Sequence, residues 1–309
     1  MAAAGPRLRA AGAVAIVLRV SPPLEPMKLV LPKGRIAQSV LELLRAVGYA
    51  VEGTDRSYRP RCAAPGVEVK LLKPQNIPTL LGLGRHDLGF AGHDWVIEQD
   101  ARLEELLDTG FDQVSIVAAV PNGMRESWRA LGRPLVVATE YERLARRFVA
   151  ERGLEAVIVR THGATEVFPP EDADMIVDNM ASGETLRQNG LAVVETLLTS
   201  STRLLAWPGV RAASPEKWER IEQLVALMRG VLLARRKVLL EMNVPRDRLE
   251  AVVKALPAMR SPTVSPLHGE SGFAVKVAVD RDLVRTLVPL VKSLGASDIL
   301  EYSLGKIIP

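Results

Sequence analysis

Short apolar runs alternate with segments of helical periodicity along the first two thirds of the chain, and few folds accommodate that order. After Met27, the apolar run 28–32 precedes apolar residues at helical spacing, until Gly48 ends the helix. Further apolar runs lie at 67–72, 87–92, 113–120, 134–139, 156–160, 174–178 and 202–208. Because parallel strands need crossover helices, this order predicts an α/β fold with mostly parallel sheets covered on both faces.

The alternation restarts after residue 120, which predicts two α/β lobes rather than one. We place the first lobe at 27–117 and 193–211, and the second at 118–192, with crossings near 118 and 192. Ligands favour the cleft of such a two-lobed arrangement and the carboxyl ends of its parallel strands.

The remaining segment, 212–309, has a different pattern. Pro and Ser mark a linker at 207–218, and a long helix follows over 216–234. The tail then reads strand, helix, strand, strand, helix, strand, at 237–243, 246–256, 261–267, 272–279, 281–294 and 298–308. This βαββαβ order predicts a ferredoxin-like domain, and it carries no catalytic constellation, so we expect a regulatory or assembly module.

Composition narrows the classes of ligand. The net charge is +4, but Lys and Arg are interspersed with Asp and Glu, which favours a small anionic ligand over nucleic acid. The single Cys62 excludes an intramolecular disulfide and fits a reducing, cytoplasmic location, and the four histidines show no metal-ligand spacing. The segment 1–26 has an apolar run too short to span a membrane and no signal cleavage site, so we expect a disordered extension or a start codon set too early.

The segment 175–190 places small polar residues between a buried strand and a helix. A helix N-terminus offers unpaired N–H groups to an anion, so this turn suits the phosphate of a sugar phosphate. Gly183 permits close backbone approach, the hydroxyls of Ser182 and Thr185 can donate hydrogen bonds, and Asp178 can accept from ribose. A plain helix N-cap at Ser182, with Glu184 in the first turn, is the alternative interpretation.

Two cations flank a glycine at the first strand-to-helix turn, in Lys33-Gly34-Arg35. Cations at a helix start oppose the helix dipole, so an anion bound between them explains the arrangement better than two solvated side chains do. Arg56 and Lys73 can reach the same anion if the fold brings them together.

Two acidic residues also follow strands. Glu140, next to Tyr141, is either a first-turn residue favoured by the helix dipole or a cleft acid, and Glu166 is either a cap residue or a cleft acid. The glycines of 89–95 indicate a close backbone approach or a tight turn.

Eight motifs follow one another along residues 27–309: LVLPKGRI, LGFAGHD, VATEYERLARRFVAERG, HGATEV, ADMIVDNMASGETLRQNGL, MNVP, SPTVSPL and GASDIL. Their joint order and spacing closely resemble the ATP phosphoribosyltransferase family in its long, regulated form. The resemblance implies a pentosyltransferase of the first step of histidine biosynthesis, in which N1 of ATP displaces diphosphate from C1 of phosphoribosyl diphosphate (PRPP). It also implies lobes of periplasmic-binding-protein-like topology, Mg²⁺ dependence, inhibition by histidine, and a homo-oligomer between dimer and hexamer.

The resemblance assigns roles to residues. Catalytic roles are expected for Asp178, Arg35, Lys33 and Glu166. Contacts with PRPP or ATP are expected from Lys33, Gly34, Arg35, Arg56, Lys73, Glu140, Tyr141, Asp178, Ala181, Ser182, Gly183, Glu184 and Thr185. The histidine site is expected at Asn243, Met259, Thr263, Ala296 and Asp298, and no side chain is assigned to the metal.

The sequence departs from the family's pattern at two places, and two alternative functions remain. The loop reads NMASGE instead of the family's commoner LVSTG, which bears on PRPP affinity, and 170–172 replaces a usual Leu-Gly pair. A purely oligomerising tail is one alternative. The other is a two-lobed solute-binding protein with a sensor tail, which requires an export signal that 1–26 does not supply.

Overall fold

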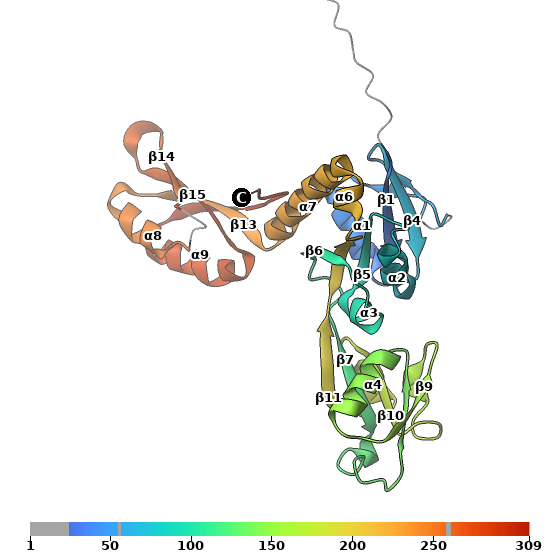
Figure 1. Cartoon of the computed structure of the whole chain (residues 1–309). Coiled ribbons are helices and arrows are strands. Elements are labelled where there is room, and N and C mark those ends of the chain that lie inside the picture. The colour runs from blue at the N-terminus through green and yellow to red at the C-terminus, as the bar shows by residue number, and fades with distance from the viewer. Residues whose placement is uncertain (1–24, 55–56, 258–260, 309) are drawn as a thin grey trace, which may run out of the picture.

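The computed structural model describes residues 25–54, 57–257 and 261–308, and this part of the chain forms three β-sheets (Figure 1). Residues 1–24 of the expected extension, Arg56 and Met259 lie outside the described residues. None of the described helices is both long and apolar enough to cross a membrane.

The first lobe contains a seven-stranded sheet with two parallel pairings at its centre. Its strand order is β2 (Val51–Glu52), β3 (Arg61–Cys62), β4 (Val67–Leu72), β1 (Met27–Pro32), β5 (Leu88–Gly92), β12 (Thr202–Ala206) and β6 (Glu104–Asp108). Strand β1 pairs in parallel with β4 and β5, whereas β12 runs antiparallel to its neighbours. The apolar sides of α1 (Ala37–Ala46) and α7 (Pro215–Arg235) cover one face, and α2 (Ile77–Gly82) covers the other, so the prediction of covered faces is confirmed. The prediction of mostly parallel strands is wrong for this sheet, because the other four pairings are antiparallel.

The second lobe contains a five-stranded sheet. Its order is β11 (Leu191–Ser200), β7 (Val114–Pro121), β10 (Met175–Met180), β8 (Leu135–Thr139) and β9 (Ala156–Arg160). Strands β10, β8 and β9 are parallel, and β7 runs antiparallel to β10 and β11. Helix α4 (Glu142–Glu151) packs on one face and α5 (Glu184–Gln188) on the other.

The chain crosses between the lobes at two adjacent places, in the connection 109–113 and at Ser201. The sequence places these crossings near 118 and 192, which differs from the structure. Strand β7 is apolar almost throughout and pairs only within the second sheet, and β11 continues that sheet to Ser200. Strands β6 and β11 were not predicted at all.

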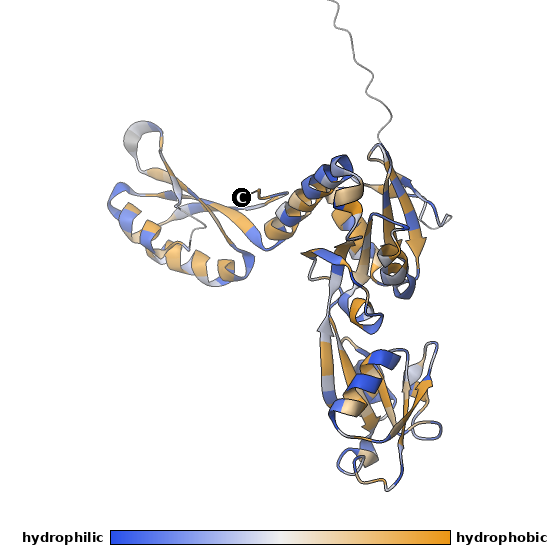
Figure 2. Ribbon diagram, viewed as in Figure 1, coloured by the Kyte–Doolittle hydropathy of each residue, from blue (hydrophilic) through white to orange (hydrophobic). Residues whose placement is uncertain are grey.

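The C-terminal sheet has the order β14 (Thr263–Pro266), β15 (Phe273–Asp280), β13 (Lys237–Val244) and β16 (Ser297–Ser303). Helices α8 (Leu249–Ala255) and α9 (Val284–Ser293) cover one face of this sheet, and alternate residues of β13 and β15 are buried against them. Apolar positions dominate these strands, whereas the helices alternate apolar and polar residues (Figure 2). This arrangement confirms the predicted ferredoxin-like βαββαβ unit.

Helix α7 joins this unit to the first lobe (Figure 1). Ser214 caps its N-terminus, and Pro215 occupies its first position, where a missing N–H costs nothing. Its apolar residues, from Trp218 to Val231, belong to the core of the first lobe. The helix that the sequence assigns to the C-terminal unit therefore packs as part of the first lobe.

Candidate active site

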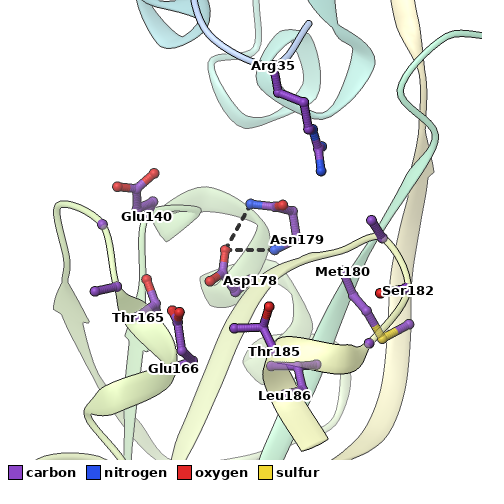
Figure 3. A pocket seen from close by; sticks show the side chains of 14 residues that line it. Arg35, Glu140, Thr165, Glu166, Asp178, Asn179, Met180, Ser182, Thr185 and Leu186 are labelled. Carbon is purple, nitrogen blue, oxygen red and sulfur yellow. Dashed lines mark hydrogen bonds between the residues drawn. The ribbon is translucent and has the colours of Figure 1, made fainter. Parts of the chain in front are cut away.

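A pocket of about 430 Å³ lies at the second lobe's side of the interlobe cleft (Figure 3). Three segments of the second lobe line it: the end of β10 with the turn after it, residues 163–166, and Glu140 after β8. Arg35 is its one lining residue from the first lobe. Its lining residues are Arg35, Glu140, Gly163, Ala164, Thr165, Glu166, Asp178, Asn179, Met180, Ala181, Ser182, Gly183, Thr185 and Leu186.

The turn between β10 and α5 is exposed and adopts the conformation that its glycine allows. Gly183 has φ +76° and directly precedes α5, so Gly183, not Ser182, is the N-cap. The Ser182 hydroxyl accepts only a long hydrogen bond, 3.4 Å, from the N–H of Glu184. Within the described residues, the N–H groups of Ala181, Ser182 and Gly183 donate no hydrogen bond. Successive free amides of this kind form a concave anion-binding surface.

Three carboxylates face the same pocket. Burial is the main cause that raises the pKa of Asp178 from 3.8 to about 6, and the negative charges of Glu166 and Glu140 raise it further. Two hydrogen bonds from Asn179, at 2.7 and 3.1 Å, act in the opposite direction (Figure 3). The site therefore holds concentrated negative charge beside an anion-binding turn, which suits a ligand with both cationic character and a phosphate.

The predicted cations are divided among several pockets. Arg35 extends toward the turn from the first lobe, whereas Lys33 lies over the ring of Tyr58, 3.4 Å from its centroid. Lys33 and Arg35 both line a second interlobe pocket of about 180 Å³. Lys73 lines a third, of about 470 Å³, which also contains Glu140.

Besides Lys33 and Lys73, two more predicted contact residues, Gly34 and Glu184, lie outside the pocket at the turn, which we call the loop pocket. Gly34, with φ +84°, lines a surface groove next to α1. Glu184 is paired with Arg187 and accepts a hydrogen bond from Gln188, so its carboxylate is turned along α5.

Residues that sequence reasoning missed join the two lobes. The carboxylate of Asp94, 5% exposed, accepts hydrogen bonds from the hydroxyl of Tyr141 at 2.8 Å and from that of Ser200 at 2.6 Å. Burial, with the charge of Asp94, raises the pKa of Tyr141. Tyr141 is only 1% exposed, stacks on Trp95 and belongs to the lobe contact, and it also lines the interlobe pocket of about 180 Å³ described above.

A second link comes from α3 (His93–Glu98), which belongs to the first lobe. The carboxylate of Glu98 accepts hydrogen bonds from the N–H groups of Arg143 and Leu144, both at 2.9 Å, and so caps the N-terminus of α4 in the second lobe. The chain offers no local signal for this pairing, since the partners are 45 and 46 residues apart.

Three of the predicted effector residues, Asn243, Thr263 and Asp298, lie on the C-terminal sheet. The side-chain amide of Asn243 donates to the Asp298 carboxylate at 3.0 Å, and Ser297 donates to the same oxygen at 3.0 Å. These hydrogen bonds lower the pKa of Asp298. Ala296 is buried nearby in the domain core, and Thr263 lies two strands away on β14.

The lobes, the cleft and the free-amide turn define a class: two-lobed α/β proteins that bind a small phosphorylated ligand between their lobes. A family model described as ATP phosphoribosyltransferase matches residues 73–230, and another, described as the HisG C-terminal domain, matches residues 234–306. The chain belongs to the ATP phosphoribosyltransferase family.

Individual relatives agree with this assignment. ATP phosphoribosyltransferase of Desulforudis audaxviator (strain MP104C) is 37% identical over 294 residues, covering 92% of this chain and 99% of that protein. That of Pelotomaculum thermopropionicum is 36% identical over 292 residues, with the same coverage of 92% and 99%. The ATP phosphoribosyl transferase (HisG:HisZ) complex from Thermotoga maritima shares the fold, with a TM-score of 0.58 at 24% identity, over 64% of this chain and 96% of that one. The predicted family, fold class and transferase activity in histidine biosynthesis are confirmed, and the solute-binding alternative is set aside.

Proposed function

We propose that the turn 181–185 binds the 5-phosphate of PRPP while Asp178 faces the ribose, in a chain that joins N1 of ATP to C1 of PRPP. The observation that carries this assignment is the exposed turn, whose amides at 181–183 are free within the described residues. Hydroxyls of Ser182 and Thr185 stand beside them, and the carboxylate of Asp178 lines the same pocket. A ribose 5-phosphate carries both an anion for the amides and hydroxyls for the carboxylate.

Electrostatics accounts for catalysis in this arrangement. Displacement at C1 develops positive charge on the ribose, and the carboxylates of Asp178, Glu166 and Glu140 are positioned to stabilise it. N1 of adenine carries a lone pair and needs no deprotonation, so no general base is required. Holding two substrates in line between the lobes supplies a further part of the rate.

The proposed reaction requires Asp178 to be ionised. Its pKa of about 6 means that the carboxylate is charged above that pH and neutral below it. We therefore expect kcat/KM to fall as the pH drops through about 6 in the free enzyme.

In this proposal the leaving diphosphate binds between the lobes, near Arg35 and Lys33, which line the second interlobe pocket. Mg²⁺ would neutralise the diphosphate and make it a better leaving group. Within the described residues no group of three or more acidic, histidine or cysteine side chains is arranged to hold a metal. That donor set fits Mg²⁺ carried mainly by substrate phosphates and water, with at most one or two carboxylates.

The regulatory part of the proposal concerns the C-terminal sheet. Asp298, ionised and fixed by Asn243 and Ser297, would accept from the α-amine of histidine, and Thr263 would complete the site with Met259 and Ala296. A homo-oligomer is supported by exposed apolar side chains on β16, since Leu300 is 50% exposed.

One assay tests the proposal. Purified chain is mixed with ATP, PRPP and Mg²⁺, and product formation is followed by ultraviolet absorbance, with and without histidine. We expect turnover that requires both substrates and decreases with histidine. Turnover without PRPP dependence would refute the site assignment, and turnover indifferent to histidine would refute the regulatory part alone.

A further inference from the structure

Asp112 has an unusual backbone in the connection 109–113 that joins β6 to β7. Its φ is +49°, the left-handed region, which non-glycine residues seldom occupy, although Asp tolerates it better than most. Such backbone strain costs roughly 1–3 kcal/mol and often coincides with functional sites. This residue lies at one of the two crossings between the lobes.

The side chain of Asp112 is partly buried, and one of its oxygens is buried without a hydrogen-bond partner. It is 13% exposed, and within the described residues its Oδ2 has no hydrogen-bond partner. Its Oδ1 lies 4.0 Å from Nε of Arg35. A buried carboxylate oxygen without a hydrogen-bond partner costs free energy, so a nearby positive charge stabilises Asp112. Among the described ion pairs, Arg35 is the one residue that pairs with Asp112.

The side chain of Arg35 is exposed but extends in a definite direction. Its side chain is 59% exposed, and it extends from the first lobe toward Asn179 and Met180 at the turn (Figure 3). Since Nε faces Asp112, the two terminal amino groups of the guanidinium remain available to an anion. Lys33 does not duplicate this arrangement, because its ammonium lies over Tyr58.

We propose that Asp112 is a positioning residue for Arg35: its charge attracts the Nε side of the guanidinium and aims the terminal amino groups at the phosphorylated substrate. An arginine fixed in this way loses less freedom when the anion binds, so the substrate binds more tightly. The inference rests on the proposed function of the loop pocket.

An opposing effect makes the test decisive. The charge of Asp112 repels an anion in the cleft, so its simple removal would tighten PRPP binding. Positioning predicts the reverse. The sign of the change therefore separates positioning of Arg35 from long-range repulsion.

The experiment measures PRPP binding by calorimetry, with kcat and KM in parallel, for Asp112→Asn and Asp112→Gly. Both replacements tolerate a positive φ, so the fold is preserved. The matched control is Asp100→Asn, because Asp100 also has a positive φ of +51° and an ion pair, to Arg143 at 2.9 Å, but does not line the cleft pockets described above. We expect both Asp112 variants to weaken PRPP binding about twofold to fivefold, as for a partly exposed charged pair, with a melting temperature no lower than that of the unaltered chain and an unaffected control.

Arg35→Ala separates the positioning role of Asp112 from the substrate contact of Arg35 itself. It should weaken PRPP binding strongly, and in its background Asp112→Asn should not weaken binding further, because only the repulsion by the Asp112 charge is left to remove. If Arg35→Ala weakens binding while Asp112→Asn leaves it unchanged or tighter, the positioning role is overturned and the proposed function stands. If Arg35→Ala itself has no effect, the role of Arg35 in the proposed function fails as well.

Discussion

Replacing Asp178 by Asn should stabilise the fold while it removes activity. Burial raises the carboxyl pKa from 3.8 to about 6 in the folded chain, so folding makes its ionisation less favourable. At pH values above 6 the charged side chain then costs about 2–3 kcal/mol of folding free energy, from a shift of roughly two pKa units. Asn keeps the acceptor oxygen for the N–H of Asn179 but carries no charge, so it removes this cost.

The pH dependence of stability determines where Asp178→Asn should raise the free energy of unfolding. Below pH 3.8 the carboxyl is protonated in both states and contributes nothing; between 3.8 and about 6 the folded state holds the extra proton, so stability falls as the pH rises. The gain from Asp178→Asn should therefore appear between pH 4 and 6 and reach its full size at pH 7–8. Urea unfolding at pH 4, 6 and 7.5 measures it.

Asp174, which directly precedes β10, supplies a control whose effect on stability should have the opposite sign. The hydrogen bond and charge of Arg133 lower its pKa, with a further hydrogen bond from the N–H of Val136. Its ionised form stabilises the fold above pH 3.8, and this contribution is lost as the pH falls through its lowered pKa. Asp174→Asn should thus destabilise the chain at pH 7.5. If Asp178→Asn were equally destabilising at that pH, the reasoning on buried charge at the site would be wrong.

Three further predictions concern the turn, the lobe contact and the effector site. Gly183→Val should abolish PRPP binding measured by calorimetry. The control is Gly190→Val, because Gly190 has a similar φ, +66° against +76° for Gly183, and open space around it, and this variant should retain binding. Equal losses of binding in both variants would indicate backbone strain alone. Tyr141→Phe leaves an oxygen of buried Asp94 without its donor and should lower the unfolding free energy by about 1–3 kcal/mol, read by urea titration; an unchanged midpoint would contradict that. Thr263→Ala should relieve histidine inhibition and leave uninhibited turnover intact, and persisting inhibition would remove Thr263 from the effector site.

The turn at 178–185 could be predicted because its evidence is local in the sequence. A buried strand, small polar residues, one glycine and a helix follow one another within a few positions, and the structure places them in one pocket. The ferredoxin-like tail was likewise predictable from the regular alternation of β13, which is buried at every second residue.

The lobe contacts could not be predicted in this way. Asp94 and Ser200 are 106 residues apart, and a polar residue on one element carries no sign of its partner on another. Strand β11 was missed because its register shifts twice, between Val193 and Glu195 and between Thr196 and Leu198, which breaks the period of two.

The surroundings of Lys33 and Arg35 could be predicted only in part. Both cations follow β1, but their neighbours in the fold differ, since the Lys33 ammonium lies over Tyr58 and Asp112 faces Arg35. Their nearness in the sequence does not predict this difference, and the anion site between them stays a prediction.

A crystal structure of the chain with PRPP bound tests the assignment of the phosphate turn most directly. The 5-phosphate oxygens should lie within hydrogen-bond distance of the backbone N–H groups of residues 181–185, with the ribose beside Asp178. A bound sugar whose phosphate lies elsewhere, with that turn unchanged and empty, would show that the assignment is wrong.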